Sequence, residues 1–187
     1  MSDIKTMNEQ SKLQLIKDHI GEFRDFPKEG IVFRDIFTAL LDGRVCTAIQ
    51  DLLIDRVKKA AVKIDAIVGL DARGFLFGFS MAAQLGIPFV PIRKKGKLPG
   101  KCRSYEYTLE YGSGILEIQE NSVRTGQNVI IVDDLLATGG TLNAAYQLVT
   151  ALGANVQEII VILELVELNG RANIPNSDKV HAFIAYD

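Results

Sequence analysis

The sequence has few of the features that mark specialised classes of protein. It contains only two cysteines, Cys46 and Cys102, far apart and without a pairing pattern, which favours a reducing, intracellular environment. No apolar stretch approaches the roughly 20 residues that a membrane-spanning helix needs. The first residues are polar and lack the apolar core of a signal peptide. We therefore expect a cytoplasmic protein.

An excess of charge of either sign is also missing. With 21 basic and 23 acidic residues the formal net charge is −2, which gives no general attraction to nucleic acid or to membranes, so we expect neither as a partner. Hydrophobic residues make up 48% of the chain and charged residues 24%, as in ordinary soluble globular proteins. The length of 187 residues predicts one domain, residues 1–187.

Several well-known catalytic motifs are absent. The sequence has no G-x-x-x-x-G-K-[ST] loop, no G-x-G-x-x-G dinucleotide signature and no G-x-S-x-G nucleophile elbow. Its two histidines, His19 and His181, are too few for a His-rich metal site. We expect both of them to be ordinary surface or packing residues.

What the chain does contain is an alternation of strand and helix patterns. Short, β-branched apolar runs predict strands buried on both faces, and apolar residues at helical spacing predict helices. The alternation predicts an α/β fold with a central, mostly parallel sheet flanked by helices. The predicted helices cover residues 8–20, 43–63, 73–86 and 139–153, and the predicted strands cover residues 65–70, 88–93, 129–132, 156–166 and 179–186. Residues 23–37, interrupted by Pro27 and Gly30, are predicted to form a loop.

The stretch VIIVDDLLATGGT, residues 129–141, carries the strongest functional signal. Two acids, Asp133 and Asp134, directly follow the apolar run, although adjacent like charges repel. The loop 137–141 then opens a helix, so its N–H groups and the helix N-terminus can bind a phosphate. Carboxylates accept hydrogen bonds from sugar hydroxyls or approach a hydrated Mg²⁺. These features predict a sugar-phosphate site; the alternative is a simple turn with the acids as an N-cap pair.

A second unusual segment is basic. Residues 93–103 contain six basic residues and no acid, and the alternating patterns of 104–112 and 115–119 after them predict an antiparallel pair. Such a segment is either a solvated surface loop or an electropositive lid over an anionic substrate.

Five segments together resemble the type I phosphoribosyltransferases. Residues 129–141 are similar to the family signature that binds phosphoribosyl pyrophosphate (PRPP). Four further segments resemble the adenine-specific members of the family: FPKEGIVFRDI (26–36), IVGLDARGFLFG (67–78), IRKKGKLPG (92–100) and YTLEYG (107–112). Ala72 departs from the pattern, because several members have serine there.

The resemblance implies an activity and an assembly. Ribose 5-phosphate would be transferred from PRPP to N9 of adenine, giving AMP and pyrophosphate in purine salvage. Mg²⁺ would arrive with PRPP and have no direct protein ligand, and the protein would be a homodimer. The resemblance also implies a small N-terminal hood at about residues 1–40 and a flexible basic lid at about residues 94–112.

It also implies roles for individual residues. Glu110 would be the catalytic acid or base, and Asp133 and Asp134 would hold the ribose hydroxyls. The 5′-phosphate would lie on Ala137, Thr138, Gly139, Gly140 and Thr141. The pyrophosphate would contact Asp71, Ala72, Arg73 and Gly74, where members often have a cis peptide, and Arg93 of the neighbouring subunit. The lid would include Lys94, Lys97 and Tyr111, and adenine would contact the main chain of Val32 and Arg34 and the side chains of Phe33 and Leu135.

Two other functions are consistent with this family. One is a regulator that senses PRPP or a purine without turnover; such regulators normally carry an added DNA-binding segment, whereas only residues 1–25 precede FPKEG. The other is a sibling enzyme for hypoxanthine or guanine. Glu110 and the basic lid favour catalysis, and the segments 26–36 and 107–112 favour adenine.

Overall fold

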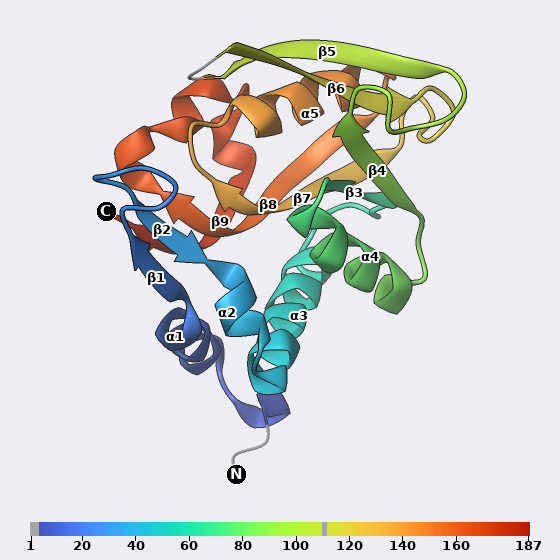
Figure 1. The fold of residues 1–187 in the computed structure, drawn as a ribbon. Helices are drawn as coiled ribbons and strands as arrows, with labels where there is room; N and C mark the ends of the chain where they lie inside the picture. Colours follow the sequence, from blue (N-terminus) through green and yellow to red (C-terminus); the bar gives the residue numbers. More distant parts are fainter. Residues whose placement is uncertain (1–3, 110–111) are drawn as a thin grey trace. The chain divides into compact units, whose positions relative to one another are not determined.

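The computed structural model describes residues 4–109 and 112–187 and divides the chain into two compact units, Met1–Lys59 and Ala60–Asp187 (Figure 1). Glu110 and Tyr111, predicted to be the acid or base and a lid residue, lie outside the described residues. No helix in the described ranges combines the length and the apolar character needed to cross a membrane.

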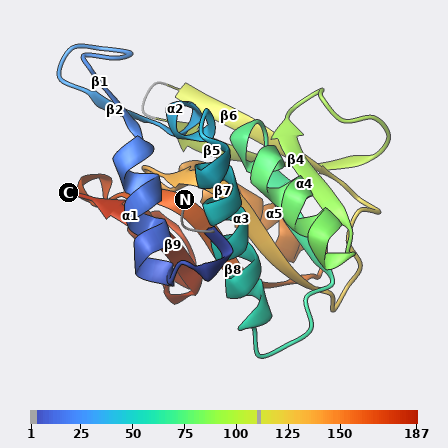
Figure 2. The same ribbon diagram turned by 90° about the horizontal axis from the view of Figure 1, so that it is seen from below.

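The first unit is built around two helices that lie side by side, α1 and α3 (Figure 2). Apolar residues at helical spacing on α3, including Val45, Ile49 and Leu53, are buried, as their periodicity predicted. Asn8 caps α1 by accepting a hydrogen bond from the Ser11 N–H. The elements of this unit are η1 (Ile4–Thr6), α1 (Glu9–His19), β1 (Gly21–Arg24), β2 (Val32–Asp35), α2 (Ile36–Leu40) and α3 (Gly43–Lys58).

The prediction of a loop over residues 23–37 was wrong at both ends. The two flanks pair with each other as the antiparallel strands β1 and β2, and α2 follows at once. The connection between the strands holds a cis Phe26–Pro27 peptide, and the Asp25 carboxylate accepts a hydrogen bond from the Gly30 N–H at 2.8 Å. Proline and glycine therefore confine the irregular backbone to the middle of the segment and leave its ends free to pair.

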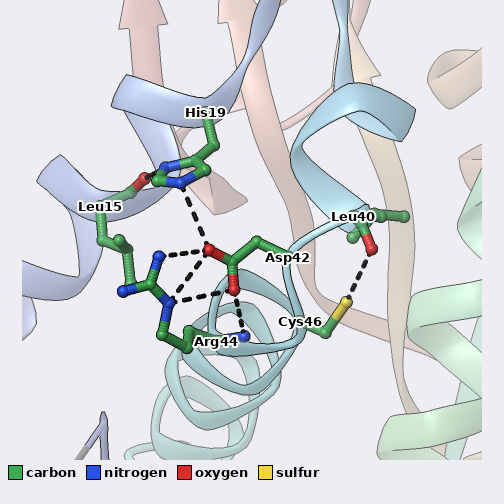
Figure 3. Close-up of polar contacts among 6 residues, drawn as sticks. All are labelled: Leu15, His19, Leu40, Asp42, Arg44 and Cys46. Carbon is green, nitrogen blue, oxygen red and sulfur yellow. Dashed lines mark hydrogen bonds and ion pairs between the residues drawn. The ribbon is translucent and has the colours of Figure 1, made fainter. Parts of the chain in front are cut away.

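Asp42 links α1 to the start of α3 (Figure 3). Its carboxylate accepts hydrogen bonds from the N–H and the guanidinium of Arg44, which lower the pKa of Asp42 to about 2. The His19 Nε2 lies 3.4 Å from the same carboxylate, while its Nδ1 is 2.8 Å from the Leu15 carbonyl. His19 thus has a packing and capping environment, in line with the expectation from the sequence.

The second unit contains a seven-stranded sheet with the order β5-β6-β4-β3-β7-β8-β9. The pairs β3–β4, β3–β7, β7–β8 and β8–β9 are parallel, and only β4–β6 and β5–β6 are antiparallel. The predicted mostly parallel α/β sheet is confirmed. The strands are β3 (Ala66–Leu70), β4 (Phe89–Lys94), β5 (Cys102–Leu109), β6 (Gly112–Gln119), β7 (Asn128–Leu136), β8 (Asn155–Leu165) and β9 (Val180–Tyr186). The helical elements are α4 (Arg73–Leu85), α5 (Gly140–Ala151), η2 (Val166–Leu168), η3 (Gly170–Asn173) and η4 (Ser177–Lys179).

The two helices α4 and α5 cover opposite faces of this sheet (Figure 1). Ala66, Val68 and Leu70 alternate along β3 and belong to the same buried cluster as apolar residues of α5. On the other face, α4 approaches closely: a Cβ on Gly78 would lie 3.5 Å from the Gly69 Cα. All residues of β3 are buried, which is why its sequence is apolar without interruption.

Candidate active site

A cavity of about 180 Å³ opens where β7 leads into α5. In the sheet, β7 lies beside β3 and runs parallel to it, and the two strands lead to helices on opposite faces, so they flank a topological switch point. Ligands of open α/β sheets bind at such switch points, beyond the carboxyl ends of the strands. The cavity is lined by Arg73, Asp133, Asp134, Leu135, Leu136, Ala137, Thr138, Gly139, Thr141 and Leu142.

The acid pair lies inside β7 rather than after it. Leu135 and Leu136 continue the strand by pairing with Leu163 and Glu164 of β8, so the strand runs four residues beyond the apolar run that predicted it. Asp134 is 5% exposed, and its carboxylate accepts a hydrogen bond from the Arg73 Nε at 2.5 Å. The cation compensates one of the two charges that sequence alone left unexplained.

No hydrogen bond from a cation to Asp133 is seen among the described residues. Burial, and then the neighbouring Asp134 charge, raise the pKa of Asp133 well above the ordinary value, and the hydrogen bond from the Asp134 N–H at 2.9 Å and the nearby Arg73 charge oppose this only in part. The environment of Asp133 therefore disfavours its ionised form, a property that marks a candidate functional position.

The loop 137–141 has the geometry of an anion cradle. Gly139 takes φ +82° and is the N-cap of α5, where no side chain makes a capping bond. The alternative in which the acids cap the helix is therefore wrong. Since the first N–H groups of α5 are not used by a side-chain cap and Thr138 and Thr141 line the cavity, this end of the helix suits a phosphate.

The turn from β3 into α4 forms a second loop beside the first. The peptide between Asp71 and Ala72 is cis, as the resemblance implied, and Ala72 is the N-cap of α4. A Cβ on Gly74 would lie 2.6 Å from the Val132 carbonyl oxygen and 3.1 Å from the Asp133 Oδ1. Only glycine allows this approach, which brings Arg73 to the acid pair.

The basic segment is tied to this second loop. The Arg93 Nε donates to the Asp71 carboxylate at 2.8 Å, and its Nη1 donates to the Lys97 carbonyl at 3.3 Å. Lys94 ends β4. Arg93, Lys94 and Lys97 are not among the residues that line the cavity, and Arg93 is bonded to Asp71.

The residues predicted to contact adenine divide between the two units. Val32, Phe33 and Arg34 form most of β2 in the first unit, where the Arg34 guanidinium pairs with Glu22 of β1. Leu135 belongs to the second unit and lines the cavity.

With this geometry established, comparison with known proteins places the chain. The phosphoribosyl transferase domain family matches residues 38–180. An adenine phosphoribosyltransferase of Drosophila pseudoobscura pseudoobscura is 50% identical over 95% of this chain and 97% of its own. The chain belongs to the adenine phosphoribosyltransferase family.

Solved structures of the family agree. The Saccharomyces cerevisiae adenine phosphoribosyltransferase, complexed with an imino-altritol bisphosphate and adenine, matches with a TM-score of 0.86 and 42% identity over 93% of this chain and 99% of that one. The Trypanosoma brucei enzyme, in complex with AMP, pyrophosphate and ribose 5-phosphate, matches with a TM-score of 0.84 and 29% identity over 97% and 80%. The fold and the family predicted from the sequence are confirmed.

For this member of the family, the sequence did not reveal which residues outside the cavity form hydrogen bonds with the basic segment and with loop 137–141. Glu117 of β6 is buried and accepts hydrogen bonds from the Gly96 N–H and the Ser104 hydroxyl, both at 2.9 Å, and so joins Gly96 of the basic segment to the residue that follows this segment. Asn173 of η3 donates a hydrogen bond to the Thr138 carbonyl of loop 137–141. An acid on an alternating strand and an asparagine near a chain turn are common, so neither pattern is a signal by itself.

The raised pKa of Asp133 predicts a pH-dependent gain in stability for Asp133→Asn. A raised pKa in the folded state favours the protonated form, so the parent loses stability as pH rises through that pKa, whereas the amide does not titrate. We expect a higher Tm for the variant at neutral pH, by about 2–4 °C for each kcal/mol of relief. The difference should shrink below the ordinary aspartate pKa of about 3.9.

Thermal unfolding of the protein without ligand, recorded from acidic to neutral pH, measures this difference. Asp178→Asn, which removes an exposed carboxylate of the same unit, is the control and should change Tm little. An Asp133→Asn variant that is no more stable than the parent at neutral pH would contradict the electrostatic description of the pair.

Proposed function

We propose that the chain transfers ribose 5-phosphate from PRPP to N9 of adenine, giving AMP and pyrophosphate in purine salvage. The observation that carries the proposal is the convergence, in one cavity, of an acid pair, a glycine-rich helix N-terminus and Arg73. The adenine, AMP, pyrophosphate and ribose 5-phosphate bound by the two solved relatives support the same substrates and products here.

The two strand-to-helix turns suit the two anionic ends of PRPP. The loop 137–141 would hold the 5′-phosphate, and Asp133 and Asp134 would accept hydrogen bonds from the ribose hydroxyls. Loop 71–74 would bind the pyrophosphate through its backbone N–H groups and through Arg73, whose planar fork of donors suits phosphate oxygens. The Asp71–Arg93 pair supports an anionic ligand near loop 71–74, because a second guanidinium lies beside that loop in the same chain; in the proposed dimer Arg93 reaches the pyrophosphate of the neighbouring subunit.

Magnesium would come with the substrate. No cluster of three or more His, Cys, Asp or Glu side chains that could hold a metal occurs in the described parts of the chain. The acids that line the cavity are Asp133 and Asp134, and Asp134 is bonded to Arg73. This donor set fits Mg²⁺ that keeps substrate oxygens and water as ligands, where it would neutralise charge on the pyrophosphate.

The chemistry requires an acid or base and exclusion of water. Positive charge develops on the ribose as pyrophosphate leaves, and water would capture the sugar cation in an open site. We propose that segment 94–112, with Lys94, Lys97 and Tyr111, closes over the site and that Glu110 exchanges the proton of the purine ring. The Arg93–Lys97 and Glu117–Gly96 hydrogen bonds anchor the base of this segment.

We also propose a homodimer and a cytoplasmic location. α4 exposes Leu76 (50%) and Phe79 (64%), an apolar surface that a second copy would bury. Cys46 and Cys102 are free thiols, which suit a reducing compartment. The net charge of −2 gives no general attraction to nucleic acid or to membranes, so we propose small molecules as the partners.

The assay that tests the proposed function is incubation with PRPP, Mg²⁺ and each purine. Val32 and Arg34 lie two apart on β2, so their main-chain groups point to the same side and can present a donor and an acceptor together. A 6-oxopurine would set its carbonyl against a main-chain carbonyl and its N–H against a main-chain N–H. Each unpaired group costs ~1–3 kcal/mol, and sites that recognise a ligand by its hydrogen bonds reject analogues by up to ~10⁴-fold. We expect AMP formation with adenine and far lower kcat/KM with hypoxanthine or guanine.

Arg34→Ala tests whether the main chain of Arg34, and not its side chain, recognises adenine. Because its guanidinium already pairs with Glu22, its loss should leave the preference for adenine intact even if the rate falls. Comparable kcat/KM for adenine and hypoxanthine in the parent would refute the proposed specificity, and loss of selectivity in Arg34→Ala alone would identify a side-chain reader.

Glu110→Gln tests the acid–base assignment. The substitution keeps the shape of the side chain and removes its titration, and a positioned acid or base contributes ~10²–10⁴-fold to the rate. We expect a loss of that order in the single-turnover rate measured with pre-bound PRPP and adenine. A rate within a factor of two of the parent would remove Glu110 from the mechanism.

Mixed dimers test whether Arg93 serves the site of the neighbouring subunit. Asp133→Asn loses a charge-assisted hydrogen bond to the ribose, worth ~1.5–3 kcal/mol, and Arg93→Ala should weaken PRPP binding. A homodimer of either variant is therefore expected to be poorly active. If the site is shared, a dimer of one Arg93→Ala and one Asp133→Asn protomer has one site with both groups and regains part of the activity. Mixed dimers no more active than either variant would assign Arg93 to its own subunit.

A further inference from the structure

The phosphate loop is contacted from behind by a short element from the C-terminal part of the chain, η3. The Asn173 Nδ2 donates to the Thr138 carbonyl at 2.8 Å. Gly170 packs against the loop so closely that a Cβ on it would lie 2.0 Å from the Ala137 carbonyl oxygen, and one on Gly139 would lie 2.1 Å from the Gly170 carbonyl oxygen. Two successive carbonyls of the loop thus face η3.

This contact determines where the amides of the loop point. In a trans peptide the C=O of one residue and the N–H of the next point in opposite directions. Among the described residues the cis peptides are Phe26–Pro27 and Asp71–Ala72, so the bond between Thr138 and Gly139 is trans. When Asn173 holds the Thr138 carbonyl, the Gly139 N–H is turned away from η3, and both residues line the cavity.

The element that carries Asn173 is itself fixed to the sheet. Arg171 makes two hydrogen bonds of 2.7 Å to Glu164, a buried residue of β8, and a third of 2.8 Å to the Val180 carbonyl of β9. Burying a carboxylate is unfavourable without such a partner, so the pair resists separation. Ile174, which follows η3, is 4% exposed. Asn173 therefore projects from a rigid support.

We propose that Asn173 is a positioning residue for the 5′-phosphate: it holds the Thr138 carbonyl and thereby aims the Gly139 N–H into the cavity. The inference rests on the proposed function, in which loop 137–141 binds that phosphate. It assigns to Asn173 a role in affinity for ligands with a 5′-phosphate and none in the pyrophosphate site, because Asn173 contacts only the first of the two anion loops among the contacts described.

The experiment compares two classes of ligand. Asn173→Ala removes the donor, and Asn173→Leu removes the donor while keeping the side-chain size. We expect both variants to bind ribose 5-phosphate and AMP about threefold to tenfold more weakly than the parent in calorimetry, the range of one net hydrogen bond. Inorganic pyrophosphate with Mg²⁺ should bind as in the parent. In turnover, KM for PRPP should rise by the same factor with kcat changed less than twofold.

Tyr146→Phe is the matched control. It removes the 2.7 Å hydrogen bond from the Asn176 Nδ2 to the Tyr146 hydroxyl, which also joins the C-terminal segment to α5 but does not involve the phosphate loop. Its affinity for ribose 5-phosphate should equal that of the parent. An equal loss in Tyr146→Phe, or an equal weakening of pyrophosphate in the Asn173 variants, would show a general structural effect and overturn the proposal.

The outcomes separate this inference from the function on which it rests. If the parent binds ribose 5-phosphate and AMP and both Asn173 variants bind them equally well, the positioning role is wrong and the proposed function stands. If the parent binds neither compound, the proposed function is wrong and this inference falls with it.

Discussion

The architecture of the site depends on two adjacent carboxylates in the last residues of a central strand, of which Asp134 is buried and Asp133 is half-buried. Asp133 and Asp134 repel each other in a place where solvent screens poorly, and Arg73 compensates only Asp134 directly. In the function proposed here, the remaining imbalance is relieved by a diol that donates hydrogen bonds to the ionised pair. A site of this kind is less stable without its ligand, which is a common property of functional positions.

The charge imbalance of the acid pair also explains why the turn after β3 and the turn after β7 lie together. Arg73 reaches Asp134 because α4 begins directly beside β7, and this approach is possible because residue 74 has no side chain to collide with the Val132 carbonyl. The parallel pairing of β3 with β7 brings the turns after both strands to the same edge of the sheet. The proposed function assigns one turn to each anionic end of PRPP, with the acids between them.

Much of this could be predicted from the sequence, for identifiable reasons. The buried parallel strands were recognisable because strands covered on both faces are apolar without interruption, as in residues 66–70. Residues 129–141 were recognisable because two acids after such a run conflict with burial. The hairpin of β1 and β2 was missed because Pro27 and Gly30 indicate a turn but say nothing about pairing on either side of it. The extension of β7 to Leu136 was missed because it depends on β8, a partner distant in sequence.

The residues that make the long-range hydrogen bonds around the site could not be predicted from local sequence patterns, for a related reason. Asn173 is 35 residues from the carbonyl that it holds, Arg73 is 61 residues from Asp134, and Glu117 is 21 residues from Gly96. None of these residue types is unusual at its position, and each acquires a role only when the sheet brings two turns together. A glycine-rich loop can be identified from its own sequence, but the contacts that hold its backbone come from residues that are distant in sequence. In this chain η3 makes such contacts with Ala137, Thr138 and Gly139, and η3 is in turn fixed to β8 by the pair of Arg171 with the buried Glu164.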